Sequence, residues 1–309
     1  MRIVRPTPDR FDEALALLQA TDRDAYGGTD WTEAELREEW DTIDLERDAW
    51  LIELGGRLAG VMHLCERRSG TFISDGYVHP ELRGRGVGAA MLELVEGRAR
   101  DRLDEAPADA RVVLHNSHLT GDASAPVLLE SRGFSAVRTF FRMVADLDEV
   151  DLSPAWPEGV DVQPLEIGTH GRRLHSANQE AFAAEWGRRR KPYEEWAKQI
   201  FEKARFDPSL CVVGWDGDDI AGFALNYAKR MGDWGWVSEL GVVPAWRRRG
   251  LGLALLRESF RRFRETGETV AALGVDSQNP TGATRLYERA GMRVLWRADV
   301  WEKELRPGV

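Results

Sequence analysis

The segment from Arg247 to Gly252 has the clearest chemical potential in this sequence, because it combines three arginines with two glycines at the start of a helical pattern. Glycine adopts positive φ without steric cost and lets a ligand approach the backbone closely. Unpaired N–H groups at a helix start, together with the positive end of the helix dipole, suit phosphate oxygens. The segment therefore predicts an anion site, and an ordinary helix entry with solvated arginines is the alternative.

A second copy of this segment lies in the first half of the chain. Residues 78–88, which read Val-His-Pro-Glu-Leu-Arg-Gly-Arg-Gly-Val-Gly, match residues 242–252. A further pair, 128–133 with 286–291, keeps the same order and nearly the same spacing. Chance similarity would not preserve order and spacing together, so the sequence indicates a duplicated domain.

The elements expected around these motifs follow one order in both halves. An acidic stretch with two prolines separates the halves, which gives an N-terminal domain at 1–145, a linker at 146–158 and a C-terminal domain at 159–309. In the second half, strands and helices in the order β-α-β-β-β-α-β-α-β are expected at 160–163, 170–183, 210–214, 220–227, 235–243, 251–266, 270–275, 280–290 and 293–302. This order predicts the mixed α/β class, with a mostly antiparallel sheet flanked by helices in each half.

Two other phosphate motifs do not fit both copies. Residues 84–89 (Gly-Arg-Gly-Val-Gly-Ala) have the spacing of a dinucleotide fingerprint, but the second copy has Arg248 and Leu253 where that motif needs glycine or alanine. Neither copy has the Gly-Lys-Ser/Thr ending of a nucleoside-triphosphate loop. We therefore expect neither kind of site.

Length and composition exclude several classes of protein. The 309 residues suffice for about two domains, and 43% hydrophobic with 30% charged residues argues against a disordered chain. No apolar run is long enough to span a membrane, and the N-terminus has no apolar signal-peptide core. With a net charge of −10 and two cysteines, we expect a cytoplasmic protein that binds neither nucleic acid nor membrane. His115 and His118 form a close pair without supporting ligands, so we expect no metal site.

Two motifs of the second half resemble those of one enzyme family. Residues 242–252 follow the pattern V-x-P-x-x-R-x-x-G-x-G, which is similar to the acetyl-CoA pyrophosphate motif of the GNAT N-acetyltransferases. Residues 279–291 begin with Asn279 and contain Leu-Tyr-Glu-x-x-Gly, which resembles the family's second signature, although Met292 replaces the usual phenylalanine. The resemblance covers both halves, as in tandem GNAT chains such as mycothiol synthase and its relatives.

The resemblance implies a GNAT-like fold in each half and acetyl-CoA as co-substrate. It also implies direct transfer of the acetyl group to a primary amine of a small-molecule acceptor. The residues expected to contact CoA are Val242, Val243, Arg247, Arg248, Arg249, Gly250, Leu251, Gly252 and Asn279, and in the first half Val78, Arg83, Gly84, Arg85, Gly86, Val87 and Gly88. For Asn279, a helix cap with Pro280 as the first helical residue is the alternative role.

The two halves differ at the position of the catalytic acid. In the family, the tyrosine that matches Tyr287 protonates the departing CoA thiolate, whereas the first half has Leu129 there, which cannot donate a proton. We therefore expect a catalytic C-terminal half and a catalytically degenerate N-terminal half. An aromatic side chain that packs its helix onto the sheet is the alternative for Tyr287.

Glu239 is the candidate base, because its strand leads into the Arg/Gly segment. Strict strand alternation places it on one face with Val237 and Gly241, where it could accept the proton of the amine. An edge carboxylate or an ion-pair partner for an arginine is the alternative. A backbone N–H near Val242 is expected to polarise the thioester carbonyl.

Acceptor recognition is expected from segments 177–206 and 226–236, with Phe182, Trp186, Tyr193 and Asn226 as candidate substrate-binding residues. Core packing is the alternative for the aromatic side chains. The functions considered are an N-acetyltransferase for a small amine, a non-catalytic acyl-CoA sensor, and mycothiol synthase itself, whose acceptor is a cysteinyl glucosaminyl-inositol. We favour the enzyme, because the acid and the turn lie in one half. We expect a monomer or a homodimer.

Overall fold

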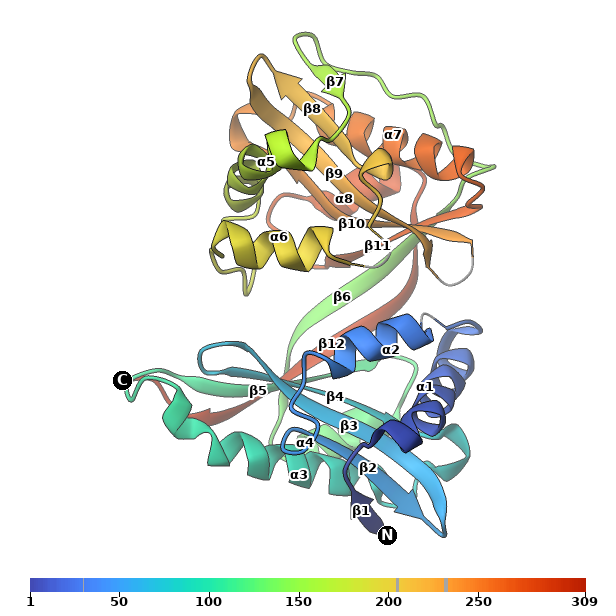
Figure 1. Ribbon diagram of the computed structural model, residues 1–309, viewed down its shortest axis with the longest axis vertical. Coiled ribbons are helices and arrows are strands. Elements are labelled where there is room, and N and C mark those ends of the chain that lie inside the picture. The colour runs from blue at the N-terminus through green and yellow to red at the C-terminus, as the bar shows by residue number, and fades with distance from the viewer. Residues whose placement is uncertain (30, 204–205, 231–232) are drawn as a thin grey trace. The chain divides into compact units, whose positions relative to one another are not determined.

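The computed structural model describes residues 1–29, 31–203, 206–230 and 233–309. It divides into two compact units: unit 1 comprises Met1–Thr139 with Ala298–Val309, and unit 2 comprises Phe140–Arg297. Each unit has helices packed on a mixed sheet, which confirms the predicted α/β class (Figure 1). No helix in the described ranges is both long enough and apolar enough to cross a membrane.

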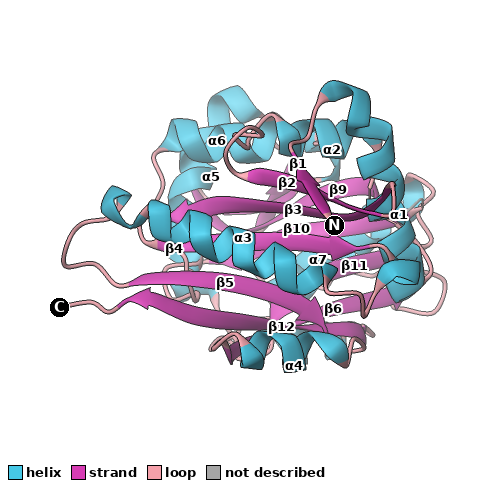
Figure 2. Ribbon diagram, turned by 90° about the horizontal axis from the view of Figure 1, so that it is seen from below, coloured by secondary structure: helices cyan, strands magenta, loops and turns pink. Residues whose placement is uncertain are grey.

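Unit 1 contains a sheet in which β4 and β5 are parallel and the other neighbours are antiparallel. Its strands, in spatial order, are β1 (Arg2–Val4), β2 (Ala49–Leu54), β3 (Arg57–Arg68), β4 (Thr71–Val78), β5 (Val112–Leu119) and the second part of β12 (Arg293–Arg306). Its helices are α1 (Phe11–Tyr26), α2 (Glu33–Trp40), α3 (Val87–Asp101) and α4 (Ser124–Ser131). Helix α3 lies along β3 and β4 (Figure 2).

Unit 2 repeats this topology, with β10 and β11 as the parallel pair. Its strands, in spatial order, are the second part of β6 (Ser135–Asp146), β11 (Val270–Asp276), β10 (Trp234–Val242), β9 (Asp219–Arg230), β8 (Val212–Asp216) and β7 (Asp161–Gln163). Its helices are α5 (Ile167–Ala181), α6 (Tyr193–Phe201), α7 (Leu251–Glu265) and α8 (Ala283–Arg289).

The compact units differ from the sequence repeats in their last strands. Residues 140–146 of β6, at the end of the first repeat, pair with β11 in unit 2. Residues 298–306 of β12, at the end of the second repeat, pair with β5 in unit 1. The expected domains 1–145 and 159–309 follow the repeats, whereas each compact unit takes the last part of its sheet from the other repeat. Residues 147–160, which overlap the expected linker, contain neither helix nor strand.

The sheet of unit 2 is covered on two faces by different helices. On β10, an ideal Cβ at Gly235 would lie 2.3 Å from the ring of Phe263, so the missing side chain lets α7 pack closely. At Gly241 the same construction meets Phe223, whose ring contacts Phe182 just after α5. Helices α7 and α8 thus cover one face, and α5 with α6 covers the other (Figure 1).

Candidate functional site

The Arg/Gly turn of unit 2 connects β10 to α7 through a short 3₁₀ turn at Pro244–Trp246. Gly250 has φ +88° and precedes α7, and no side chain caps the helix start. The first intrahelical bonds run from the N–H groups of Leu253 and Ala254 to the carbonyl of Gly250, so the N–H groups of Leu251 and Gly252 precede them. An exposed, uncapped helix start of this kind is a suitable cradle for a phosphate group.

The two copies of the turn have the same backbone conformation. Gly84 and Gly86 of unit 1 have φ +73° and +82°, and Arg248 and Gly250 of unit 2 have φ +64° and +88°. Because left-handed backbone costs about 1–2 kcal/mol for a residue with a Cβ, Arg248 adopts a strained conformation that Gly84 adopts without strain.

The last glycine of the motif lets two helices approach each other. An ideal Cβ at Gly252 would lie 3.1 Å from Leu286 of α8, and one at Gly88 would lie 3.2 Å from Leu128 of α4. Both distances are tighter than ordinary van der Waals contact. In both units, this position therefore serves the packing of the helix that carries the turn against the next helix.

The arginines of the turn have different contacts. Arg247 donates from Nε to the carbonyl of Val242 (3.1 Å) and from Nη2 to that of Ala181 (2.9 Å), so it joins the end of β10 to the end of α5. The guanidinium of Arg249 lies over the ring of Trp246, 4.7 Å from the ring centre. Arg248 and Arg249 are both exposed. The positive charge available at the turn surface therefore comes from Arg248 and Arg249.

Among the described residues, no strand pairs with one edge of β10 near the turn. The ladder with β11 ends at Val237, whereas the ladder with β9 continues to Val242. The N–H of Val243 donates to Ala221 just beyond β9 (3.0 Å). Because N–H groups alternate along a strand, those of Leu240 and Val242 point to the edge that β11 has left. Sequence reasoning indicated the Val242 amide and missed that of Leu240.

A β-bulge changes the face on which Glu239 lies. The β9–β10 register shifts between Val237 and Glu239, and a bulge of one residue reverses the alternation that follows it. Val237 packs into the core beneath α7 and α8, whereas Glu239 reaches Asn178 of α5. The expectation that Glu239 shares a face with Val237 is therefore wrong, although Glu239 does share its face with Gly241.

The carboxylate of Glu239 is held by two partners. One oxygen accepts a hydrogen bond from the Asn178 side chain, and the other accepts from both terminal nitrogens of Arg188 at 3.2 Å. Arg188 also donates to the Asn178 oxygen (2.6 Å), which closes a ring of three side chains. The Glu239 side chain is 13% exposed. This contact corresponds to the alternative in which Glu239 is an ion-pair partner for an arginine.

Tyr287 lies on α8 and is buried in the core between α7, α8 and the sheet. Burial raises the pKa of its phenol well above the usual value, and the negative charge of Glu185 raises this pKa further. The phenol is therefore fully protonated at neutral pH and is chemically able to donate a proton. Tyr287 can pack its ring in the core and also act as an acid, because proton donation needs only the hydroxyl group.

Asn279 does not cap the helix that follows it. Helix α8 begins at Ala283 after Gly282, which has φ +74°. The side-chain oxygen of Asn279 instead accepts hydrogen bonds from the N–H (2.9 Å) and hydroxyl (2.6 Å) of Thr281, which forms an Asx turn. The expected helix start at Pro280 is therefore wrong, and so is the alternative role of Asn279 as the cap of that helix.

The candidate acceptor residues lie in different environments. Asn226 is fully buried and donates to the carbonyl of Leu210 and to Ser259, so it belongs to the interior. The hydroxyl of Tyr193 packs against Gly171 of α5. Phe182 and Trp186 are only partly buried. Residues 204, 205, 231 and 232 of the expected acceptor segments lie outside the described residues.

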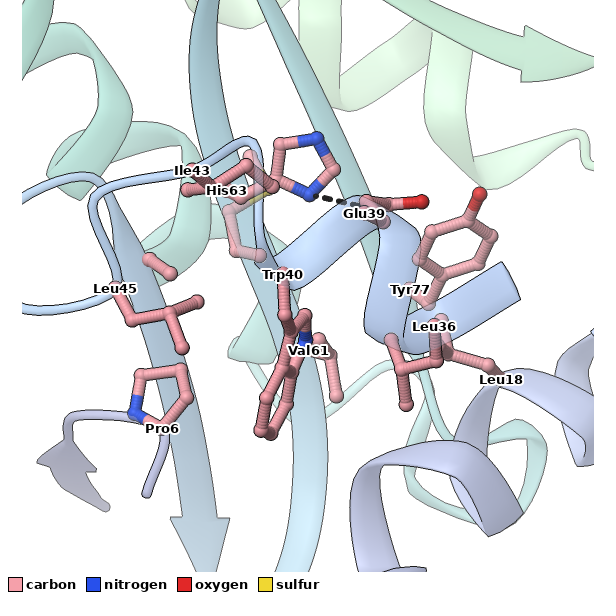
Figure 3. A pocket seen from close by; sticks show the side chains of 12 residues that line it. Pro6, Leu18, Leu36, Glu39, Trp40, Ile43, Leu45, Val61, His63 and Tyr77 are labelled. Atoms are coloured by element: carbon pink, nitrogen blue, oxygen red, sulfur yellow. Dashed lines mark ion pairs between the residues drawn. The ribbon is translucent and has the colours of Figure 1, made fainter. Parts of the chain in front are cut away.

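Unit 1 has a different set of side chains at the corresponding place. Leu129 is buried where unit 2 has Tyr287. Asp75, which matches Glu239, lies 3.6 Å from Nε2 of His63, and Nδ1 of the same ring is 3.2 Å from Glu39. Burial lowers the pKa of His63, although Asp75 raises it. Glu39 and His63 line a small pocket with apolar side chains of α1, α2 and β3, in which Glu39 lies between His63 and Tyr77 (Figure 3).

In unit 1, a side chain bridges the point where β4 and β5 separate. Their ladder ends at the pair Ser74 and Asn116. The Asn116 side chain donates to the carbonyl (3.1 Å) and the hydroxyl (3.0 Å) of Ser74. The ladder between β3 and β4 has no register shift next to Asp75, unlike the one at Glu239. Within the described parts of the two units, the helix-start cradle is thus common to both, and the bulge and the tyrosine occur in unit 2.

Comparison with known proteins identifies the family. The model of the Acetyltransferase (GNAT) family matches residues 14–119 and 172–292. The chain is 32% identical to the mycothiol acetyltransferase of Geodermatophilus obscurus, over 94% of this chain and 96% of that protein. It is 28% identical to the mycothiol acetyltransferase of Saccharopolyspora erythraea, over 80% and 82% of the two chains.

Solved structures agree with this result. A GCN5-related N-acetyltransferase from Sphaerobacter thermophilus matches with a TM-score of 0.86 and 32% identity, over 100% of this chain and 96% of that chain. The tandem GNAT protein from the clavulanic acid biosynthesis pathway shares the fold, with a TM-score of 0.74 and 17% identity over 100% and 99% of the two chains. The protein therefore belongs to the GNAT acetyltransferase family, as a tandem member related to the mycothiol acetyltransferases.

Proposed function

We propose that unit 2 transfers the acetyl group of acetyl-CoA directly to a primary amine of a small-molecule acceptor. The observation that carries this proposal is the combination, within one unit, of an uncapped helix start, a β10 edge without a strand partner, and a protonated tyrosine. These features supply the three needs of acyl transfer from a thioester: anchoring of the donor, polarisation of its carbonyl, and protonation of the leaving thiolate.

The start of α7 is the proposed anchor for the CoA pyrophosphate. The N–H groups of Leu251 and Gly252 are directed at the anion, and Arg248 and Arg249 add charge at the surface. The amides of Leu240 and Val242, on the unpartnered edge of β10, extend this anchor by pairing with the amide-containing arm of CoA as an added strand would. One of these two amides is also the proposed donor to the thioester carbonyl.

Tyr287 and Glu239 have complementary proposed roles. The phenol of Tyr287 donates its proton to the CoA sulfur as the thioester bond breaks, and Glu239 accepts the proton that the amine must lose. Asn279 is proposed to contact the CoA arm by its side-chain nitrogen, because its side-chain oxygen is occupied by Thr281. Phe182 and Trp186 remain proposed acceptor contacts.

Unit 1 is proposed to support unit 2 and to bind CoA without turnover. Its turn, with Arg83 and the glycines at 84, 86 and 88, has the conformation of the unit 2 turn, but Leu129 has no proton to donate. Arg83 pairs with Asp24 at 2.6 Å, in contrast to the backbone contacts of Arg247.

A cysteinyl glucosaminyl-inositol is the second candidate for the acceptor. It is favoured by the relatives named mycothiol acetyltransferase, one of which aligns over nearly the whole length of both chains. The primary amine of its cysteinyl group satisfies the chemistry proposed above, so this candidate changes the acceptor and not the reaction. A sensor that binds acetyl-CoA without turnover is the remaining alternative.

The release of free CoA thiol tests these alternatives. The purified chain is incubated with acetyl-CoA and, separately, with glucosamine, S-methylcysteine amide and a cysteinyl glucosaminyl-inositol whose own thiol is blocked. We expect thiol release that depends on the amine, with equal amounts of the acetylated product detected by mass spectrometry. Saturable binding of acetyl-CoA without release in any of these reactions contradicts the proposal and supports the sensor.

A further inference from the structure

The contact between Glu239 and Arg188 blocks the group that the proposed reaction needs as a base. Both terminal nitrogens of Arg188 lie 3.2 Å from one oxygen of a carboxylate that is only 13% exposed. A guanidinium and an ammonium make the same kind of charge-assisted hydrogen bond to a carboxylate. In this arrangement, the arginine therefore occupies the position that an incoming ammonium would need.

We propose that Arg188 is a specificity-determining residue of unit 2, whose guanidinium the cationic amine of the acceptor displaces from Glu239. This inference rests on the proposed function of unit 2 and adds an exchange of ion-pair partners before acetyl transfer. An acceptor that binds without a positive charge near Glu239 leaves the arginine in place. The site thereby selects acceptors that enter as ammonium ions.

The segment that carries Arg188 is suited to such an exchange. Residues 182–192 contain neither helix nor strand. The far end of this segment is held to α5 by side chains: His175 contacts the carbonyl of Lys191 (2.8 Å), and Gln179 accepts from the N–H of the same residue (3.2 Å). Displacement of the Arg188 side chain breaks its hydrogen bonds to Glu239 and Asn178 and its contact with the ring of Phe182 (4.8 Å), but no backbone hydrogen bond of a helix or of the sheet. Segments without regular secondary structure rearrange at lower free-energy cost than helices and strands.

A second carboxylate lies close to the displaced arginine. Oε2 of Glu185 is 3.9 Å from Nη1 of Arg188, at the outer limit of an ion pair, and Glu185 is on the same segment. A rotation of the Arg188 side chain toward Glu185 keeps the guanidinium beside a negative charge when it leaves Glu239. Glu185 is also the carboxylate whose negative charge raises the pKa of Tyr287.

The alternative is that Arg188 braces Glu239 in its working orientation. The two roles predict opposite effects on the acceptor KM when the guanidinium is removed. Under displacement, Arg188→Gln removes a competitor and lowers the acceptor KM. Under bracing, the same change leaves a carboxylate without its cation and raises KM or lowers kcat.

The test compares Arg188→Gln, Arg188→Lys and Arg189→Gln with the unchanged chain at saturating acetyl-CoA. Arg189 is a matched control, because it is the next residue and pairs with Glu195 of α6 instead of Glu239. For Arg188→Gln we expect an acceptor KM about fivefold lower, with kcat within about twofold. Arg188→Lys retains a competing charge, so its acceptor KM should lie closer to that of the unchanged chain than that of Arg188→Gln does. Arg189→Gln retains the contact with Glu239, so it should match the unchanged chain.

A rise in acceptor KM or a tenfold fall in kcat for Arg188→Gln, with circular dichroism unchanged, overturns the inference in favour of bracing. Calorimetric titration of glucosamine and S-methylcysteine amide into the CoA-bound protein measures the same competition without turnover. Tighter binding by Arg188→Gln in a chain that releases no thiol supports the exchange and rejects the proposed reaction. If the unchanged chain acetylates these amines but the Arg188→Gln variant binds them no more tightly than the unchanged chain does, the exchange is rejected and the proposed reaction stands.

Discussion

At the scale of single residues, the environment separates the two proposed proton-transfer groups. Tyr287 is surrounded by apolar side chains, and burial together with the charge of Glu185 keeps its phenol protonated. Glu239 accepts hydrogen bonds from the side chains of Asn178 and Arg188. Tyr287 thus offers a hydroxyl that can donate a proton, and Glu239 offers a carboxylate that can accept one, which are the two roles that a paired acid and base require.

Replacement of Tyr287 by phenylalanine tests the acid. The ring remains to fill the core, and only the hydroxyl is lost, so we expect kcat to fall by about 10²- to 10⁴-fold, while the Kd for acetyl-CoA changes little. Because the phenol pKa lies above its usual value near 10, the unchanged chain should keep the acid protonated up to about pH 9. Stopped-time thiol release measures kcat, and calorimetry measures the Kd for acetyl-CoA. A kcat within threefold of the unchanged chain leaves Tyr287 only its packing role.

Backbone strain at Arg248 gives a prediction on stability. Its φ of +64° is the conformation that Gly84 has in the other copy. We expect Arg248→Gly to raise the free energy of unfolding by about 1 kcal/mol, because relief of the left-handed strain exceeds the extra backbone entropy that glycine adds to the unfolded chain.

Urea unfolding followed by circular dichroism measures this change. Arg249→Gly is the control, since Arg249 has negative φ and gains no relief of strain, and it should be neutral or destabilising. Equal effects of the two substitutions would show that the strain at Arg248 has no measurable cost.

At the scale of elements, the sequence predicted which segments form helices and strands better than where their side chains point. The duplicated motifs correctly placed β10 before the turn and α7 after it. Helix α2 was missed, although Thr32 and Glu35 form a capping box that is visible in the sequence. The bulge at Glu239 could not be predicted, because it depends on the pairing of β10 with β9. The Arg188–Glu239 pair joins residues 51 positions apart, so it requires the tertiary fold.

The packing of α7 against α8 gives a prediction at this scale. A side chain at Gly252 must displace Leu286, which precedes Tyr287 on α8. We expect Gly252→Val to lower the free energy of unfolding by about 1–3 kcal/mol and to lower kcat as well, because α8 carries the proposed acid.

The second change Leu286→Ala supplies the control. It makes room for the valine, so the double variant should be more stable than the sum of the single effects predicts. Thermal and urea unfolding of all four chains gives the coupling. Strict additivity would contradict a direct contact between these two positions.

At the scale of the whole molecule, the exchange of terminal strands makes each compact unit depend on both repeats. Unit 1 receives residues 298–306 of β12, including Trp301, which is 6% exposed within the core of unit 1. Lys303 on the same strand donates to Glu96 of α3 at 2.6 Å. The second repeat thus ends in a strand that completes the sheet of unit 1.

Trp301→Ala therefore should weaken unit 1, although Trp301 belongs to the second repeat. Replacement of a buried tryptophan by alanine lowers the free energy of unfolding by about 3–5 kcal/mol. The side chain packs in the core of unit 1, so the loss of stability should be local to that unit. We expect faster amide hydrogen exchange in β5 and α3, with exchange in α7 unchanged. Leu295→Ala on the same strand is the control, because Leu295 is 36% exposed and precedes the part of β12 in unit 1. Faster exchange in α7 and α8 with β5 protected would mean that β12 stabilises its own repeat.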